Sequence, residues 1–212
     1  MPPNYTHASV FGLTPSTVPK ASQVSEEDAA DASEANALDF LSAETTIPVL
    51  RVRRIVKRGW DFLIVTDYIP GPTLAHVWPT LSMWRKISVA FTLRRYVRQL
   101  RRLKASATTP PGPLTRSAQG ARRCESPHLW SGSFSPRSFA TYSNLSAFFN
   151  DRQRMAMDAK KLPRDDPSRN DLFDNSEPLV LTHQGLNLRN VIVGEDGRLW
   201  IVDWAWAGYY SP

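Results

Sequence analysis

The feature that most constrains this chain is a polar loop, residues 183–190, that leads directly into two short apolar runs joined by a Gly-Glu-Asp-Gly turn. The Asp-Gly pair at 196–197 is a strong signal for the turn of a β-hairpin. The two strands of a hairpin run antiparallel, so the residues at their outer ends are neighbours. We therefore expect Asn190, just before the first strand, to lie beside Asp203, at the end of the second.

An amide oxygen and a carboxylate oxygen brought together in this way are hard ligands, of the kind that Mg²⁺ prefers. In kinase catalytic loops an aspartate serves as the base, an asparagine five residues later binds metal, and a later aspartate binds metal that bridges nucleotide phosphates. Asn190 keeps this spacing from position 185, but position 185 is glycine. The pattern predicts a metal site at Asn190 and Asp203 that lacks the base expected at Gly185.

The same segment resembles the catalytic loop and metal-binding motif of the aminoglycoside phosphotransferase family, particularly its fungal members. Those relatives read His-Gln-Asp-Leu-Asn or His-Gly-Asp-Leu, then Arg-Asn, then Ile/Val-Asp-Trp. This chain reads His-Gln-Gly-Leu-Asn at 183–187, Arg-Asn at 189–190 and Val-Asp-Trp at 202–204. The resemblance implies an α+β, protein-kinase-like fold, in which a small N-lobe sheet with one helix precedes a mainly helical C-lobe.

The resemblance also implies a nucleotide site in the first third of the chain. Lys20 corresponds to the strand lysine that neutralises phosphates, and Glu34 to the helix glutamate that orients it; a surface lysine and a solvated glutamate are the alternatives. Asp67 and Tyr68 lie in the expected hinge between the lobes. The implied cofactors are ATP and Mg²⁺, and the implied partner is a small-molecule acceptor of unknown identity. His183 is expected to brace the loop rather than to catalyse.

Three departures from the family pattern bear on activity. Gly185 removes the carboxylate that would accept the proton of the substrate hydroxyl. No Gly-rich phosphate loop is visible, since Gly12 is the only glycine before residue 59. The chain ends nine residues after Asp203, so a C-terminally truncated C-lobe is expected. An impaired ATP-dependent phosphotransferase, a non-catalytic pseudokinase that binds nucleotide or protein, and an inactive remnant all remain open.

The predicted organisation is a disordered or degenerate start at 1–17, an N-lobe at 18–69 and a partial C-lobe at 70–212 that contains the hairpin region 183–204. Apolar periodicity and turn residues place the elements within this frame. Helices are expected at 26–44, 80–104 and 141–157, strands at 47–57 and 60–69, a loop at 105–140 and a mobile stretch at 158–177.

Composition limits the partners only weakly. Lys and Arg total 26 against 20 for Asp and Glu, and the resulting net charge of +6 suits an anionic ligand such as a nucleotide. The arginines between 94 and 102 are expected to form a solvated helix face, and without RNA-binding patterns no nucleic-acid partner is expected. No apolar run approaches the ~18 residues of a membrane span. With the single Cys124 and no visible targeting signal, a cytoplasmic location is expected, and the oligomeric state stays open.

Overall fold

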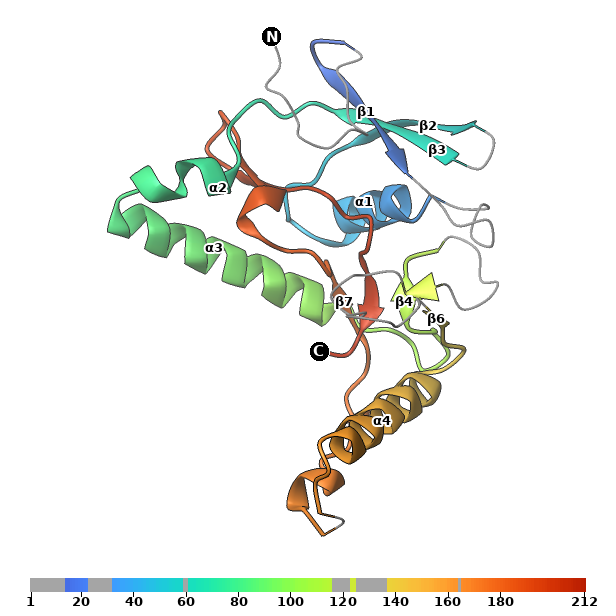
Figure 1. Cartoon of the computed structure of the whole chain (residues 1–212). Coiled ribbons are helices and arrows are strands. Elements are labelled where there is room, and N and C mark those ends of the chain that lie inside the picture. The colour runs from blue at the N-terminus through green and yellow to red at the C-terminus, as the bar shows by residue number, and fades with distance from the viewer. Residues whose placement is uncertain (1–13, 23–31, 59–60, 116–122, 125–136, 164) are drawn as a thin grey trace.

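The computed structural model describes residues 14–22, 32–58, 61–115, 123–124, 137–163 and 165–212. These residues form an α+β structure with small antiparallel sheets and several helices (Figure 1), which confirms the predicted fold class. The first part of the expected disordered start, the beginning of the expected first helix and most of the expected loop after residue 115 lie outside the described residues.

The N-terminal sheet has three antiparallel strands in the order β1-β3-β2, with β1 at Thr17–Ser22, β2 at Val52–Arg58 and β3 at Asp61–Asp67. The central strand is the dense apolar run of the sequence, and its Ile64 is buried. Helix α1, Ser33–Glu44, packs the Ala35 side of its surface against Ile64. Its Leu41 side enters the main core, so α1 joins the sheet to the rest of the protein.

A sharp turn follows β3 and leads into the helical part. Gly71 has a φ of +143°, and a Cβ there would lie 2.1 Å from the carbonyl oxygen of Val193, so only glycine fits. The chain then forms α2 at Leu74–Val77, the short 3-10 helix η2 at Trp78–Thr80 and the long helix α3 at Met83–Arg102. The hydroxyl of Ser82 caps α3 by accepting from the backbone N–H of Arg85.

The C-terminal half contains the predicted hairpin, with β8 at Val191–Val193 and β9 at Leu199–Ile201. A second small sheet has the order β4-β10-β7 and consists of Gly112–Pro113, Gly208–Tyr210 and Val180–Thr182. The remaining elements are the two-residue strands β5 (Arg123–Cys124) and β6 (Arg137–Ser138), helix α4 (Tyr142–Ala159), and the 3-10 helices η3 (Pro167–Asn170) and η4 (Leu188–Asn190).

The main core lies between α1, α3 and the hairpin. Its buried side chains include Leu38, Leu74, Leu100, Ile201 and Trp204. A separate cluster around Phe139 and Leu145 packs α4 against the small C-terminal sheet. No helix in the described part of the chain is long and apolar enough to cross a membrane.

Several predicted boundaries are wrong. The first helix, expected over 26–44, begins at Ser33 within the described residues, because Ala32 has a non-helical backbone; residues 26–31 of that prediction lie outside the described residues. The strand expected over 47–57 begins at Val52, since Thr46–Pro48 and neighbouring residues instead contact α3 and the hairpin. The expected loop 105–140 contains β4, because Gly112 and Pro113 pair with β10 far along the chain.

Candidate active site

The centre of the candidate site is the ammonium group of Lys20. Lys20 lies on β1 opposite Ile64, so the sheet fixes its position. Its Nζ lies 3.0 Å from both carboxylate oxygens of Glu34 on α1. The same Nζ donates to Oδ1 of Asp203 at 2.5 Å. Glu34 and Asp203 follow Lys20 by 14 and 183 positions in the sequence, and the carboxylates of both contact its ammonium.

The neighbouring carboxylates decide the direction in which the pKa of Lys20 is shifted. Burial lowers the pKa of the ammonium, but the carboxylates of Glu34 and Asp203 outweigh burial and raise the pKa above its ordinary value of 10.5. Lys20 is therefore a fixed positive charge throughout the physiological range. An anionic ligand reaching this point would meet a cation already held in place.

Glu34 has a second contact that ties the N-terminal part to the hairpin. Its Oε1 accepts a hydrogen bond of 3.2 Å from the backbone N–H of Trp204. The Glu34 side chain is only 6% exposed, which shields both of its interactions from water. Figure 1 shows the corresponding arrangement, with α1 beside the C-terminal segment of the chain.

The hairpin brings Asn190 and Asp203 together, as its geometry requires. The backbone N–H of Val202 donates to the carbonyl of Asn190 at 3.0 Å, which closes the open end of the hairpin. The Asn190 side-chain amide then donates to Oδ2 of Asp203 at 3.4 Å and to the carbonyl of Gly185 at 3.0 Å. The loop, the asparagine and the aspartate form one hydrogen-bonded unit.

This pair of residues fits a magnesium ion in its chemistry. The Asp203 side chain is 37% exposed, so its carboxylate is open to a ligand. Mg²⁺ commonly takes one or two protein oxygen ligands and completes its shell with water and phosphate oxygens. Among the residues that the structure describes, no group of three or more His, Cys, Asp or Glu side chains could hold a metal ion. A sparse site at Asn190 and Asp203 is consistent with that finding.

Position 185 lies beside this unit without a side chain. A Cβ at Gly185 would lie 3.5 Å from Cε3 of Trp206 and 3.6 Å from Nδ1 of His183, both ordinary contacts. The glycine does not have a positive φ, whereas the neighbouring Gln184 and Asp203 do, at 59° and 65°. The backbone at 185 therefore accepts an L-amino acid, and no conformational constraint requires glycine at this position.

His183 holds the loop through contacts with Val202 and Trp204. Its Nε2 lies 3.0 Å from the carbonyl oxygen of Val202, and its ring centroid lies 4.4 Å from that of Trp204. Burial lowers the pKa of His183, and the nearby ammonium of Lys20 lowers it further. The imidazole is neutral at pH 7, and the contact with Val202 makes Nε2 the protonated nitrogen.

The two hinge residues have contacts within and next to the N-terminal sheet. The Asp67 carboxylate forms a two-point ion pair with the guanidinium of Arg53. The backbone N–H of Tyr68 donates to the carbonyl of Ser16 at 2.8 Å. Both residues stand at the end of β3, three positions or more beyond the partner of Lys20, which is about 10 Å along a strand.

Sequence reasoning missed three participants. Trp204 contributes its backbone N–H to Glu34, and Asn187 donates from its side chain to the carbonyl of Gly185 at 2.9 Å. Trp206 stands against position 185. Asn187 and Trp204 both lie within the recognised motif, so their place in the sequence was visible although their contacts were not.

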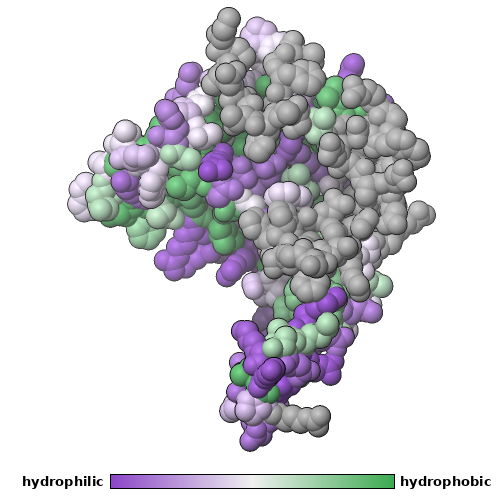
Figure 2. All heavy atoms as spheres, in the orientation of Figure 1, coloured by the Kyte–Doolittle hydropathy of each residue, from purple (hydrophilic) through white to green (hydrophobic). Residues whose placement is uncertain are grey.

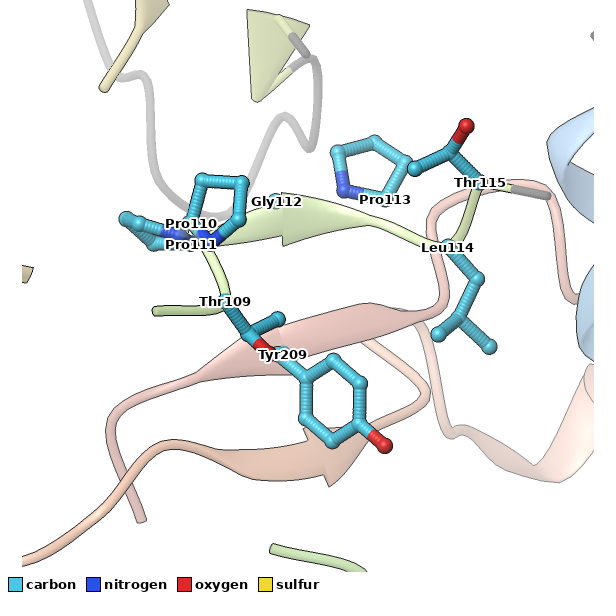
Figure 3. A pocket seen from close by; sticks show the side chains of 8 residues that line it. All are labelled: Thr109, Pro110, Pro111, Gly112, Pro113, Leu114, Thr115 and Tyr209. Carbon is cyan, nitrogen blue, oxygen red and sulfur yellow. The ribbon is translucent and has the colours of Figure 1, made fainter. Parts of the chain in front are cut away.

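Among the described residues, a hollow lies at the small C-terminal sheet beside β4 and β10. It is a pocket of about 80 Å³ lined by residues 109–115 and Tyr209 (Figure 3). None of its lining residues is charged, and its volume is well below the ~300 Å³ at which ligand pockets begin. The pocket does not suit a nucleotide.

A comparison of the sequence with known protein families identifies the family of the chain. The sequence matches the model of the phosphotransferase enzyme family, abbreviated APH, over residues 18–212. No curated protein matches the chain. The matched range includes Lys20, Glu34, Asn190 and Asp203, and it confirms the family indicated by the sequence motifs. The chain belongs to the phosphotransferase enzyme family.

Proposed function

We propose that this chain binds a nucleoside triphosphate with Mg²⁺ at the cluster of Lys20, Glu34, Asn190 and Asp203, and transfers its phosphoryl group to a small-molecule hydroxyl only slowly. The observation that carries the proposal is the convergence of one cation, one amide and two carboxylates from distant segments around Lys20. A structural core has no need of so many charged groups at one point.

Each residue has a distinct role in this proposal. Asn190 and Asp203 would hold Mg²⁺, which when bound neutralises charge on the phosphate oxygens. Lys20 would give its ammonium to a phosphate oxygen, and Glu34 would keep that ammonium in place from the buried side. The contact of Glu34 with the N–H of Trp204 supports this role, because it fixes α1 relative to the segment that carries Asp203.

Slow transfer follows from Gly185. Loss of a general base lowers a rate by about 10²–10⁴-fold. Positioning and electrostatic stabilisation supply most of the catalysis in phosphoryl transfer, so a residual rate is expected. His183 is a poor substitute for the base, since its ring is buried and held by Val202.

A second candidate function is non-catalytic binding of the nucleotide, as in a pseudokinase. Gly185 favours this function because it removes the proton acceptor and leaves the charged cluster intact. The two candidates share the same binding site and differ only in turnover.

The binding step is testable by calorimetric titration of ATP, with and without Mg²⁺. We expect Mg²⁺ to tighten binding in the unmodified protein and to have no effect in Asp203→Asn. Lys20→Met should weaken binding about 10- to 100-fold, the equivalent of one charge-assisted hydrogen bond. Glu195→Gln, an exposed acid at the hairpin turn, is the matched control and should bind as the unmodified protein does. Binding that is indifferent to both Mg²⁺ and Lys20→Met would contradict the proposal.

A further inference from the structure

The outward surface of α3 carries large apolar side chains in water. Trp84 is 81% exposed, Met83 70%, Phe91 64% and Ile87 39%. The opposite side of the same helix is buried through Tyr96 and Leu100. Contiguous exposed apolar surface of this kind is rare on monomeric proteins and marks an interaction site.

These side chains belong to one row along the helix. Met83, Ile87 and Phe91 follow one another at steps of four, and Trp84 flanks them. Continuing the same row at steps of three and four leads to Arg94, Arg98 and Arg101, which are exposed and are flanked by the exposed Arg95 and Arg102. We call this row and its flanking residues the α3 outer face. Its first half is apolar and its second half is cationic.

The cationic half is not neutralised within the described part of the chain. None of its arginines takes part in an ion pair there, whereas Arg53, Arg154, Arg169 and Arg198 do. Figure 2 shows the two characters together on the α3 end of the molecule, where hydrophobic and hydrophilic spheres adjoin. Five like charges on one surface oppose one another and favour an acidic partner.

We propose that the α3 outer face binds an acidic amphipathic helix of another protein. Charge complementarity sets the direction of that helix. Acidic residues stabilise the N-terminal half of a helix through its macrodipole. The acidic N-terminal half of the partner therefore lies over the arginines, and its apolar C-terminal half lies antiparallel over Met83, Ile87 and Phe91. A 20-residue helix such as α3 is about 30 Å long, enough for several turns of contact.

Other occupants fit this face less well. If two copies of the chain met with their α3 helices parallel, arginines would face arginines. If the two helices were antiparallel, the arginines of each would face the apolar side chains of the other. A nucleic acid would neutralise the arginines but would leave the apolar half in water. Helices that lie on membranes separate apolar and basic residues around the helix, whereas the α3 outer face separates them along its length.

The test uses the whole chain and a fluorescent peptide of about 20 residues, with glutamates in its N-terminal half and leucines at i, i+3, i+4 and i+7 in its C-terminal half. Fluorescence anisotropy should show saturable binding that weakens at least tenfold, as at an interface hot spot, in Phe91→Ala. Arg98→Glu should weaken binding to a similar degree. Binding should also weaken between about 50 mM and about 500 mM NaCl.

Two control variants distinguish specific binding at the α3 outer face from non-specific binding elsewhere on the surface. Arg85→Glu changes an exposed arginine of α3 that lies off the row, and Met155→Ala removes an exposed apolar side chain of α4. Both should bind within about twofold of the unmodified protein, as expected for surface positions outside a contact. A peptide with lysine in place of glutamate should not bind.

Five results would overturn the proposal. The first is no saturable binding of the acidic peptide at its highest soluble concentration, and the second is equal binding of the peptide to the unmodified protein, Phe91→Ala and Arg98→Glu. Vesicles of phosphatidylcholine and phosphatidylserine that bind through Phe91 while the peptide does not would assign the face to membranes. A dimer that dissociates in Phe91→Ala would assign it to a second copy. Duplex DNA competing fully with the peptide would assign it to nucleic acid.

Discussion

Replacing Glu34 by alanine should destabilise the protein and show how the two parts of the site are joined. Glu34 accepts from Lys20 at 3.0 Å and from the N–H of Trp204 at 3.2 Å, and both contacts are shielded from water. Without this carboxylate the N–H of Trp204 loses its acceptor, and Lys20 keeps only Asp203.

The two losses set the size of the effect. An unsatisfied buried N–H costs about 1–3 kcal/mol, and a hydrogen bond to a charged group contributes about 1.5–3 kcal/mol. Removing the buried carboxylate also removes its desolvation penalty, so we expect the lower end of the sum, about 2.5 kcal/mol. For a chain of this size that lowers Tm by about 5–10 °C. Urea unfolding followed by circular dichroism measures the free energy directly.

Two control variants isolate the parts of this effect. Glu34→Gln keeps an acceptor for the N–H of Trp204 and loses only the charge, so it should cost about 1–2 kcal/mol. Glu44→Ala, at the exposed end of the same helix, should change stability by less than about 0.5 kcal/mol. Equal stabilities for Glu34→Ala and Glu34→Gln would refute the role given to the Trp204 contact. A change below about 0.5 kcal/mol for both would refute the role of the whole ion pair.

Two further predictions concern pH and backbone geometry. Burial lowers the pKa of His183 below 6.5. Just below pH 6.5, the unfolded chain therefore binds a proton at this residue that the folded chain does not bind. The free energy of unfolding should fall as the pH drops below about 6.5, by at most about 1.4 kcal/mol per pH unit. Urea titrations at several pH values should show this slope in the unmodified protein and lose it in His183→Asn, and an equal slope in both would contradict it. Gly71→Ala should destabilise by more than about 3 kcal/mol, since its Cβ would meet the carbonyl of Val193 at 2.1 Å. Gly197→Ala, with a φ of +75° but open space around it, should cost only about 1 kcal/mol; equal melting temperatures for these two glycine variants would show that the turn at 71 relaxes freely.

The parts of the fold that could be predicted from the sequence are those with local signals. The Asp-Gly turn and the apolar runs on either side of it fix the hairpin, and the hairpin alone is sufficient to bring Asn190 to Asp203. The long helix α3 follows from its periodic apolar stripe and Ser82. The pairing of Lys20 with Glu34 is not local; it was expected only from the family resemblance, and the structure brings the two residues together.

The contacts that escaped prediction join residues far apart in the chain. The carboxylate of Glu34 and the N–H of Trp204 are separated by 170 positions, and the sequence around either residue does not predict their hydrogen bond. The strand at Gly112 forms only because β10 offers a partner. The ion pair of Asp67 with Arg53 depends on the register between β2 and β3, which has an irregularity between Val52 and Arg54.

The central claim is that the site lacks a base and is otherwise poised for phosphoryl transfer. The most direct measurement is the rate of Mg²⁺-dependent ATP hydrolysis by Gly185→Asp, with Gly185→Asn as a control of the same shape. The Cβ of either variant fits at this position, because a Cβ there makes only ordinary contacts with Trp206 and His183. We expect Gly185→Asp to hydrolyse ATP up to about 10²–10⁴-fold faster than the unmodified protein, and Gly185→Asn to give no gain. An unmodified protein that already turns over near ~1 s⁻¹, or an equal gain in both variants, would contradict the account.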